Sequence, residues 1–190
     1  MRTLLVTLFF CFASSAAAAG LDPDPDSMGI YFDTAGNSNC LVMPPFQQVS
    51  AYLLLMNPAG PVDGFECSVT MTGAPYFILS TVIAGGGENW CYSPNCYASS
   101  SAWSLPVLNG AALLVTWTIM QTSSSHLEFF IGPSTIASLP GGLPVVVGDG
   151  VLRRCGVASG DVNLPVASIN GSCPVGDEVS SFGRVKGLFR

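Results

Sequence analysis

The feature that most constrains the fold is a series of short strand-like segments separated by turn-forming residues. Val, Ile, Leu, Thr and aromatic residues gather in runs, and loops containing Gly, Pro, Asn or Ser separate the runs. No stretch of the body keeps the 3.6-residue period of an amphipathic helix. We therefore expect strands at residues 29–33, 49–57, 64–71, 76–83, 111–121, 126–132, 143–149 and 150–157.

The side-chain pattern within these runs indicates how the strands are buried. The segments ECSVTM (66–71) and TWTIMQ (116–121) alternate small polar with apolar residues, as a sheet with one buried face requires. The runs AYLLLM (51–56) and PVVVG (144–148) are continuously apolar, which is typical of central strands. The sequence thus predicts an all-β fold, a two-sheet sandwich or jelly roll of about eight to nine strands.

Composition supports this fold class and argues against a nucleic-acid partner. Only 9% of the residues are charged, mean hydropathy is +0.50, and the chain has 21 Gly and 14 Pro. A helical bundle needs charged outer faces, which this chain lacks. The few Lys and Arg residues form no patch that could neutralise phosphates.

Residues 1–19 have the order of a secretory signal peptide. A basic start (MR) precedes a compact apolar run (TLLVTLFFCF) and then small residues (ASSAAAAG), and we place cleavage after Ala19. The longest apolar run of the remaining chain, GAALLVTWTIMQ (110–121), has the length of a core strand and is too short to span a bilayer. We expect a secreted, extracellular or cell-surface protein with no transmembrane segment in the mature chain.

Residues 20–28 are acidic and Pro-rich. Asp22, Asp24 and Asp26 alternate with prolines, and Asp33 follows at a spacing that resembles a calcium loop. However, Ser27 stands where such a loop needs Gly, and Pro23 and Pro25 favour extended backbone. We therefore favour a spacer that needs no cofactor, with calcium as the open alternative.

Residues 176–190 differ in pattern from the body at residues 29–175. Val179, Phe182, Val185 and Leu188 recur at steps of three, with acidic residues before them and basic residues among and after them. We expect a short C-terminal helix. It either covers an end of its own sandwich or serves as a tail that an export or attachment apparatus recognises.

Six of the seven cysteines lie beyond the signal peptide, and an exported chain is expected to oxidise them. Cys91 and Cys96 bracket Pro94-Asn95 and form the first predicted pair. Cys155 and Cys173 flank a turn-rich stretch and form the second, which leaves Cys40 with Cys67 by elimination. A zinc site is the weaker alternative because paired CxxC spacing is absent.

Several segments resemble a known family. The stretch VSAYLLLMNPAGPVDGFECSVTM (49–71), followed by GAALLVTWTIM (110–120) and GLPVVVGDGVLRRC (142–155), is similar to the cohesin-like, immunoglobulin-like sandwich of bacterial extracellular proteins. The ending FGRVKGLFR (182–190) resembles the WGxVKxLYR-type ending of uncharacterised secreted bacterial proteins that carry such a body. The resemblance implies a cohesin-like fold. Because nothing in the sequence marks a dockerin-binding face, that activity is not carried over.

The sequence contains few candidate catalytic or ligand-binding residues. A single histidine, His126, offers no Ser-His-Asp arrangement, and the separation of carboxylates such as Glu66 and Glu128 cannot be obtained from sequence. Four aromatic residues gather in the loop at 86–103, where they either stack on sugar rings or fold back over the end of a sheet: Trp90, Tyr92, Tyr97 and Trp103. We expect no enzyme and no catalytic or metal-binding residue.

The sequence predicts a non-enzymatic exported sandwich that acts in cell-surface or extracellular interaction and assembly, with protein partners or self-association. The alternative is a carbohydrate-binding module that uses loop 86–103 to bind glycans.

Overall fold

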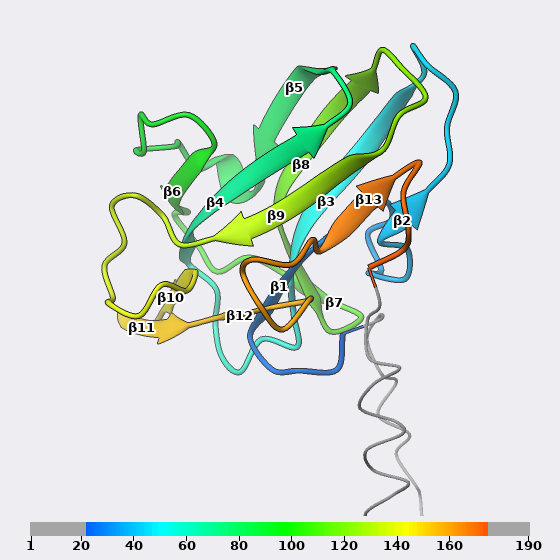
Figure 1. Ribbon diagram of the computed structural model, residues 1–190. Coiled ribbons are helices and arrows are strands. Elements are labelled where there is room, and N and C mark those ends of the chain that lie inside the picture. Colours follow the sequence, from blue (N-terminus) through cyan, green and yellow to red (C-terminus); the bar gives the residue numbers. More distant parts are fainter. Residues whose placement is uncertain (1–21, 175–190) are drawn as a thin grey trace, which may run out of the picture.

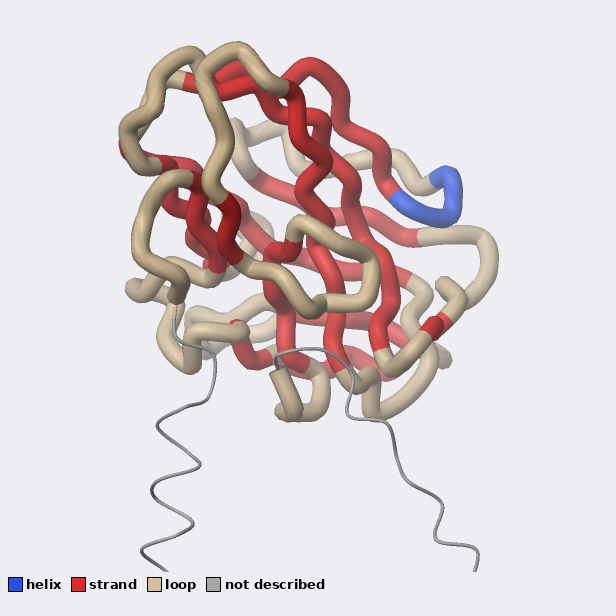
Figure 2. Tube along the Cα trace, turned by 90° about the vertical axis from the view of Figure 1, so that its right-hand side faces the viewer, coloured by secondary structure: helices blue, strands red, loops and turns tan. Residues whose placement is uncertain are grey.

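The computed structural model describes residues 22–174, which form two β-sheets stacked face to face (Figures 1 and 2). Sheet A contains, in spatial order, β12 (Gly156–Val157), β1 (Ser27–Tyr31), β3 (Gln48–Met56), β8 (Ala111–Gln121) and β5 (Tyr76–Ile83), and β7 (Val107–Leu108) pairs with one end of β8. Sheet B contains β11 (Val151–Arg154), β10 (Val145–Gly148), β4 (Gly64–Gly73), β9 (Leu127–Gly132), β13 (Ala167–Ile169) and β2 (Cys40–Leu41), and β6 (Cys96–Ser100) pairs with β4. The described residues also include the 3₁₀ turn η1 (Ala84–Gly86).

All eight predicted strands are present, and the all-β sandwich is confirmed. The predicted number of strands is too low, because the described residues form 13. Four strands lie outside the predicted segments, β2, β6, β7 and β13, and they have only two to five residues each. The fifth arises because the predicted strand at 150–157 is divided into β11 and β12. Segments this short show no periodicity in the sequence, and they become strands through the neighbours that tertiary folding gives them.

The core lies between the two sheets and follows the predicted alternation. In β8, Val115, Trp117 and Ile119 are buried, while the threonines between them are partly exposed. In β9, Leu127, Phe129 and Ile131 face the core from the opposite sheet. The inner faces of both sheets therefore meet in one apolar layer, as a sandwich requires.

Strands β9 and β10 continue one another along the same side of β4. Gly132 at the end of β9 pairs with Ser68, and Val145 at the start of β10 pairs with Glu66. Residues 133–144 leave the sheet between the two strands, and β6 pairs with residues 64–68 on the other side of β4. The first half of β4 is consequently flanked by β6 and β10, which positions the candidate site described below.

The disulfide pattern confirms one predicted pair and corrects the other two. Cys91 is bonded to Cys96, as expected, but Cys40 is bonded to Cys173. Cys67 and Cys155 are buried thiols. The predicted Cys155–Cys173 pair is wrong because β13 pairs with β2, which brings Cys40 to the edge of sheet B next to residue 173. Cys155 lies elsewhere, where the chain passes from β11 in sheet B to β12 in sheet A.

Burial keeps the two remaining thiols protonated. It raises the pKa of Cys155 to about 12, and it raises the pKa of Cys67 still further above the ordinary value. Because the thiolate is the reactive form of cysteine, neither side chain is a candidate nucleophile.

The described part of the acidic stretch, residues 22–28, leads directly into the sandwich. Strand β1 begins at Ser27, and the Asp26 carboxylate forms an ion pair with Arg153, with a distance of 2.9 Å from Nε to Oδ2. Asp26 Oδ1 also accepts a hydrogen bond from the backbone N–H of Ala59. Arg153 in turn donates to the carbonyl oxygens of Gly60 and Pro61. The Asp26 carboxylate thus ties the entry of β1 to the 59–61 loop and to β11.

The predicted signal peptide at 1–19 and the predicted helix at 176–190 lie outside the described residues. Within residues 22–174, no helix has the length and apolarity needed to cross a membrane.

Candidate functional site

The predicted aromatic loop at 86–103 is divided in the structure by a strand. Residues 96–100 form β6, so only the segments on either side of it are loops. Tyr97, within β6, turns toward the core. Its hydroxyl oxygen accepts a hydrogen bond of 2.8 Å from Nε1 of Trp117, and the two rings meet edge to face at 5.7 Å. Tyr97 is therefore a structural residue and does not belong to a ligand surface with the other three aromatics.

The other three aromatic side chains are exposed. Tyr92 is 95% exposed at the tip of the small disulfide loop, Trp103 is 67% exposed after β6, and Trp90 is 56% exposed. Trp90 lines a pocket that is described below. The sequence prediction thus found one residue of the candidate site, Trp90. It grouped Trp90 with the core residue Tyr97 and with Tyr92 and Trp103, which are not among the residues that line this pocket.

The pocket lies where β6 and β10 flank the first half of β4. It has a volume of about 130 Å³. Its lining residues come from four strands and one loop, and most of them are apolar: Phe65, Glu66, Trp90, Ala98, Ser99, Ser100, Val145, Val147 and Leu152.

Gly64 makes this close approach of strands possible. A Cβ atom at this position would lie 2.5 Å from the carbonyl oxygen of Ser99 and 2.9 Å from Cγ1 of Val147. Any side chain at position 64 would therefore push β6 or β10 away from β4. The absence of a side chain lets Val147 and Ser100 pair closely with β4 on either side of it.

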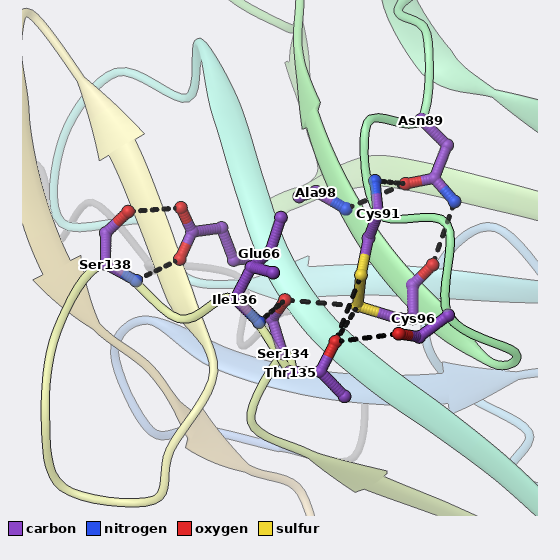
Figure 3. Close-up of a disulfide and its surroundings, with 10 residues drawn as sticks. Glu66, Asn89, Cys91, Cys96, Ala98, Ser134, Thr135, Ile136 and Ser138 are labelled. Atoms are coloured by element: carbon purple, nitrogen blue, oxygen red, sulfur yellow. Dashed lines mark hydrogen bonds between the residues drawn. A yellow bond between two sulfur atoms is a disulfide. The ribbon is translucent and has the colours of Figure 1, made fainter.

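Glu66 supplies the only charged side chain of the pocket lining. Its two carboxylate oxygens accept hydrogen bonds from Ser138, one from the backbone N–H at 2.7 Å and one from the hydroxyl at 2.5 Å (Figure 3). These bonds fasten the 133–144 excursion to β4. Both donors are neutral, so the negative charge of Glu66 is solvated but not balanced by them.

The Cys91–Cys96 disulfide holds the segment that carries Trp90. The backbone N–H of Trp90 donates to the carbonyl oxygen of Ala98 in β6 at 2.8 Å. The Asn89 side chain accepts from the N–H groups of Cys91 and Ala98 and donates to the Cys96 carbonyl oxygen (Figure 3). The backbone at Trp90 is therefore held by β6 and by the disulfide loop, which positions this residue at the pocket.

A second surface is the edge of sheet A at β5. Its sequence, YFILSTVI, contains no charged residue. Phe77 is 58% exposed, Leu79 is 46% exposed and Val82 is 60% exposed. One side of β5 pairs with β8, and within the described residues no strand pairs with its other side. Natural proteins usually protect such an edge with charges, Pro or a covering segment.

Several solved structures resemble this sandwich. No protein-family model and no curated protein matches the sequence. A type II cohesin dyad from the adaptor scaffoldin ScaA of Acetivibrio cellulolyticus aligns with a TM-score of 0.50 and 13% identity, over 77% of this chain and 49% of that chain. The fold is cohesin-like.

Two further neighbours are also cohesin modules. A type II cohesin domain from the cellulosome of Acetivibrio cellulolyticus has a TM-score of 0.47 and 11% identity, covering 76% of this chain and 95% of that one. A cohesin module from a family 33 glycoside hydrolase of Clostridium perfringens has a TM-score of 0.43 and 11% identity, covering 68% and 90%. The chain thus spans about half of the first neighbour and nearly all of the second.

The titratable residues considered in the sequence are dispersed over the cohesin-like sandwich. Glu66 lines the pocket in sheet B, whereas Glu128 and His126 lie at the other end of β9, in a separate open hollow with Asn170, Gly171 and Ser172. Among residues 22–174, no three His, Cys, Asp or Glu side chains come close enough together to hold a metal ion. The residues that the sequence prediction missed are Val145, Val147 and Leu152, which are distant in sequence from Trp90 and carry no local signal.

Asp63 fastens the loop that carries Trp103, and its contribution to stability should depend on pH. Its carboxylate accepts 2.5 Å and 2.7 Å hydrogen bonds from the Ser104 hydroxyl and the Asp149 N–H, and these bonds, in that order, lower its pKa below 3.8. A lowered carboxyl pKa stabilises the fold above its unfolded-state value, and this stabilisation is lost as pH falls through the folded-state value. We therefore expect Asp63→Asn to lower the melting temperature at neutral pH.

The measurement is a series of thermal melts of both proteins between about pH 7 and pH 2. The difference in melting temperature should shrink below about pH 4. A difference that stays constant over this range would contradict the assigned hydrogen bonds.

Proposed function

We propose that this chain is a non-enzymatic extracellular module that assembles with protein through the free edge of β5. The observation that carries the proposal is an eight-residue strand that is apolar, uncharged, exposed and unpaired on one side within the described residues. Such an edge offers a row of backbone N–H and C=O groups to an added strand, and its side chains supply apolar contact.

The fold supports an interaction role. The first cohesin neighbour belongs to an adaptor scaffoldin. The described part of the cohesin-like sandwich presents scattered carboxylates and buried thiols in place of a catalytic constellation, which suits a binding module. The two disulfides and the predicted signal peptide are consistent with an oxidising, extracytoplasmic location.

The partner we propose at β5 is a second copy of this chain. An antiparallel pair of identical strands is self-complementary around a two-fold axis. Two copies repel each other over most of their surfaces because the chain carries a net charge of −6, but β5 contributes no charge to that repulsion. Salt should therefore strengthen the association, since it screens the long-range repulsion and leaves apolar contact intact.

The test is the molecular mass of the protein as a function of concentration, measured by light scattering or sedimentation. We expect the native chain to form dimers as concentration rises, and Phe77→Lys with Val82→Lys to weaken self-association at least about tenfold by introducing charge at the edge. The double variant adds two positive charges to a chain of net charge −6, so the magnitude of the net charge falls and general repulsion between copies weakens. A loss of association in the double variant would therefore be caused by the charges placed on the β5 edge and not by general repulsion.

A matched control carries the same two charges elsewhere. Val42 and Ile136 are exposed and lie outside β5, so Val42→Lys with Ile136→Lys should leave association unchanged. A native chain that stays monomeric into the millimolar range, or equal losses in both double variants, would overturn the proposal.

Carbohydrate binding is a second candidate because Trp90, Tyr92 and Trp103 each expose more than half of their surface. Exposed aromatic rings can stack on the faces of sugars. If this function holds, glycan-array binding should be present in the native chain and absent in Trp90→Ala and Trp103→Ala. Binding that survives both substitutions would remove this candidate.

A further inference from the structure

The pocket at β4, β6 and β10 has the size of one side chain. Its volume of about 130 Å³ equals roughly four water molecules at liquid density. Pockets that enclose a whole small-molecule ligand are larger, about 300–1,000 Å³. What fits here is a single projecting group of a larger partner, as in the anchor pockets of protein interfaces.

The pocket walls favour an apolar stem. Val145 is buried, and together with Val147 and Leu152 it forms an aliphatic wall on the β10–β11 side, on the same face of the sheet as Glu66. Trp90 closes the opposite side with a ring that is more than half exposed. A methylene chain of three or four carbons would gain apolar contact with these walls.

The charge of Glu66 favours a cation at the end of that stem. A carboxylate offers about four lone-pair positions, and Ser138 uses two of them. The ion pair found within residues 22–174 joins Asp26 to Arg153, so Glu66 has no cationic partner there. A negative charge beside an apolar pocket and an exposed indole ring makes a site for a cation that can also contact an aromatic face.

The surrounding chain strengthens this complementarity. Of the six Lys and Arg residues, only Arg153 and Arg154 lie within residues 22–174, whereas all the acidic residues except Asp177 and Glu178 lie there. Arg153 is paired with Asp26, and Arg154 donates to the carbonyl oxygen of Pro140. The sandwich therefore presents an acidic field that attracts basic partners.

We propose that this pocket binds the side chain of an arginine from a partner protein. The aliphatic part of the side chain fills the apolar pocket, and the guanidinium group donates to Glu66 while it stacks on Trp90. Arginine fits better than lysine because its planar group can hydrogen-bond a carboxylate and lie against an aromatic face at the same time. This site lies in sheet B, whereas the β5 edge belongs to sheet A, so the arginine proposal can be tested independently of self-association.

The proposal can be tested on the exported protein by NMR, using the indole N–H signals of its three tryptophans. The probe is N-acetyl-arginine methylamide, and its control is the citrulline analogue, which has nearly the same shape and no charge. We expect the Trp90 signal to shift saturably with arginine in the millimolar range, and at least about tenfold more weakly with citrulline. The Trp103 and Trp117 signals should not move.

Variants separate the two recognition elements. Glu66→Gln should weaken arginine binding about five- to tenfold. Trp90→Leu should also weaken it while keeping an apolar wall, and because this variant lacks the Trp90 indole, its binding is followed by the backbone amide signals of β6. Glu88→Gln is the matched control, because it removes the same charge from an exposed residue outside the pocket lining. An unchanged Trp117 signal shows that each variant retains its core.

Three outcomes would overturn the proposal. The first is equal binding of arginine and citrulline, and the second is no shift of Trp90 at tens of millimolar probe. The third is a shift of Trp90 with an oligosaccharide such as cellohexaose and none with arginine, which would assign the exposed ring to carbohydrate binding.

Discussion

A chain that carries Cys40→Ser and Cys173→Ser is expected to lose about 4 kcal/mol of unfolding free energy. The bond joins residues 133 positions apart, so its removal frees most of the unfolded chain from one large loop. The loss of unfolded-state constraint grows with the length of that loop. In the folded state the same bond fastens β2 to the segment that follows β13, at the edge of sheet B.

The measurement is denaturant unfolding of the native and double-serine proteins, with Cys91→Ser and Cys96→Ser as the matched control. The control bond spans only 5 positions, so its removal should cost about 2 kcal/mol. Peptide mapping should find Cys40 linked to Cys173, with Cys67 and Cys155 as thiols that react only after unfolding. Equal losses in the two variants, or a peptide linking Cys155 to Cys173, would contradict the assignment.

Trp117→Ala should destabilise the protein by about 3–5 kcal/mol. Trp117 is completely buried in β8, and its removal would leave a large cavity between the sheets. The substitution also removes the indole N–H that bonds to the Tyr97 hydroxyl in β6. Since β6 holds Trp90 through the Ala98 carbonyl oxygen, the pocket should loosen along with the core.

Tyr97→Phe isolates the hydrogen bond from the packing. It keeps the ring contact but leaves the buried Trp117 N–H without its partner, which should cost roughly 1–3 kcal/mol. Denaturant unfolding of both variants gives the comparison. If Tyr97→Phe were as destabilising as Trp117→Ala, or if both were neutral, the placement of Trp117 between the sheets would be wrong.

The strands of this protein could be predicted because their signal is local. In β8 the alternation of Thr116, Trp117, Thr118 and Ile119 defines a buried and an exposed face without reference to any other part of the chain. The same logic located β1, β3, β4, β5, β8, β9, β10 and β11. It missed β2, whose two residues hold too little pattern and which exists only because β13 lies beside it. It also treated β11 and β12 as one strand, although β12 pairs with β1 in the other sheet.

The candidate site could be predicted only in part. Trp90 was predicted as a ligand-binding residue, but nothing near it in the sequence indicates Leu152 or Val145. These two residues reach the pocket because β10 continues the line of β9 along β4. Tyr97 is as aromatic as Trp90 in the sequence, yet the two point to opposite environments. Burial of one ring and exposure of the other follow from the placement of β6, which was predicted as loop.

The all-β class, the alternation of buried and exposed positions, and the Cys91–Cys96 bond could be predicted from sequence, because each depends on residues close together in the chain. Tertiary structure alone decided the partner of Cys173, the free edge of β5 and the pocket around Glu66. These depend on which strands lie next to each other, and that choice reflects the packing of the whole core. The local residue pattern determines the secondary structure of each segment, and the order of strands in the sheets determines which residues it contacts.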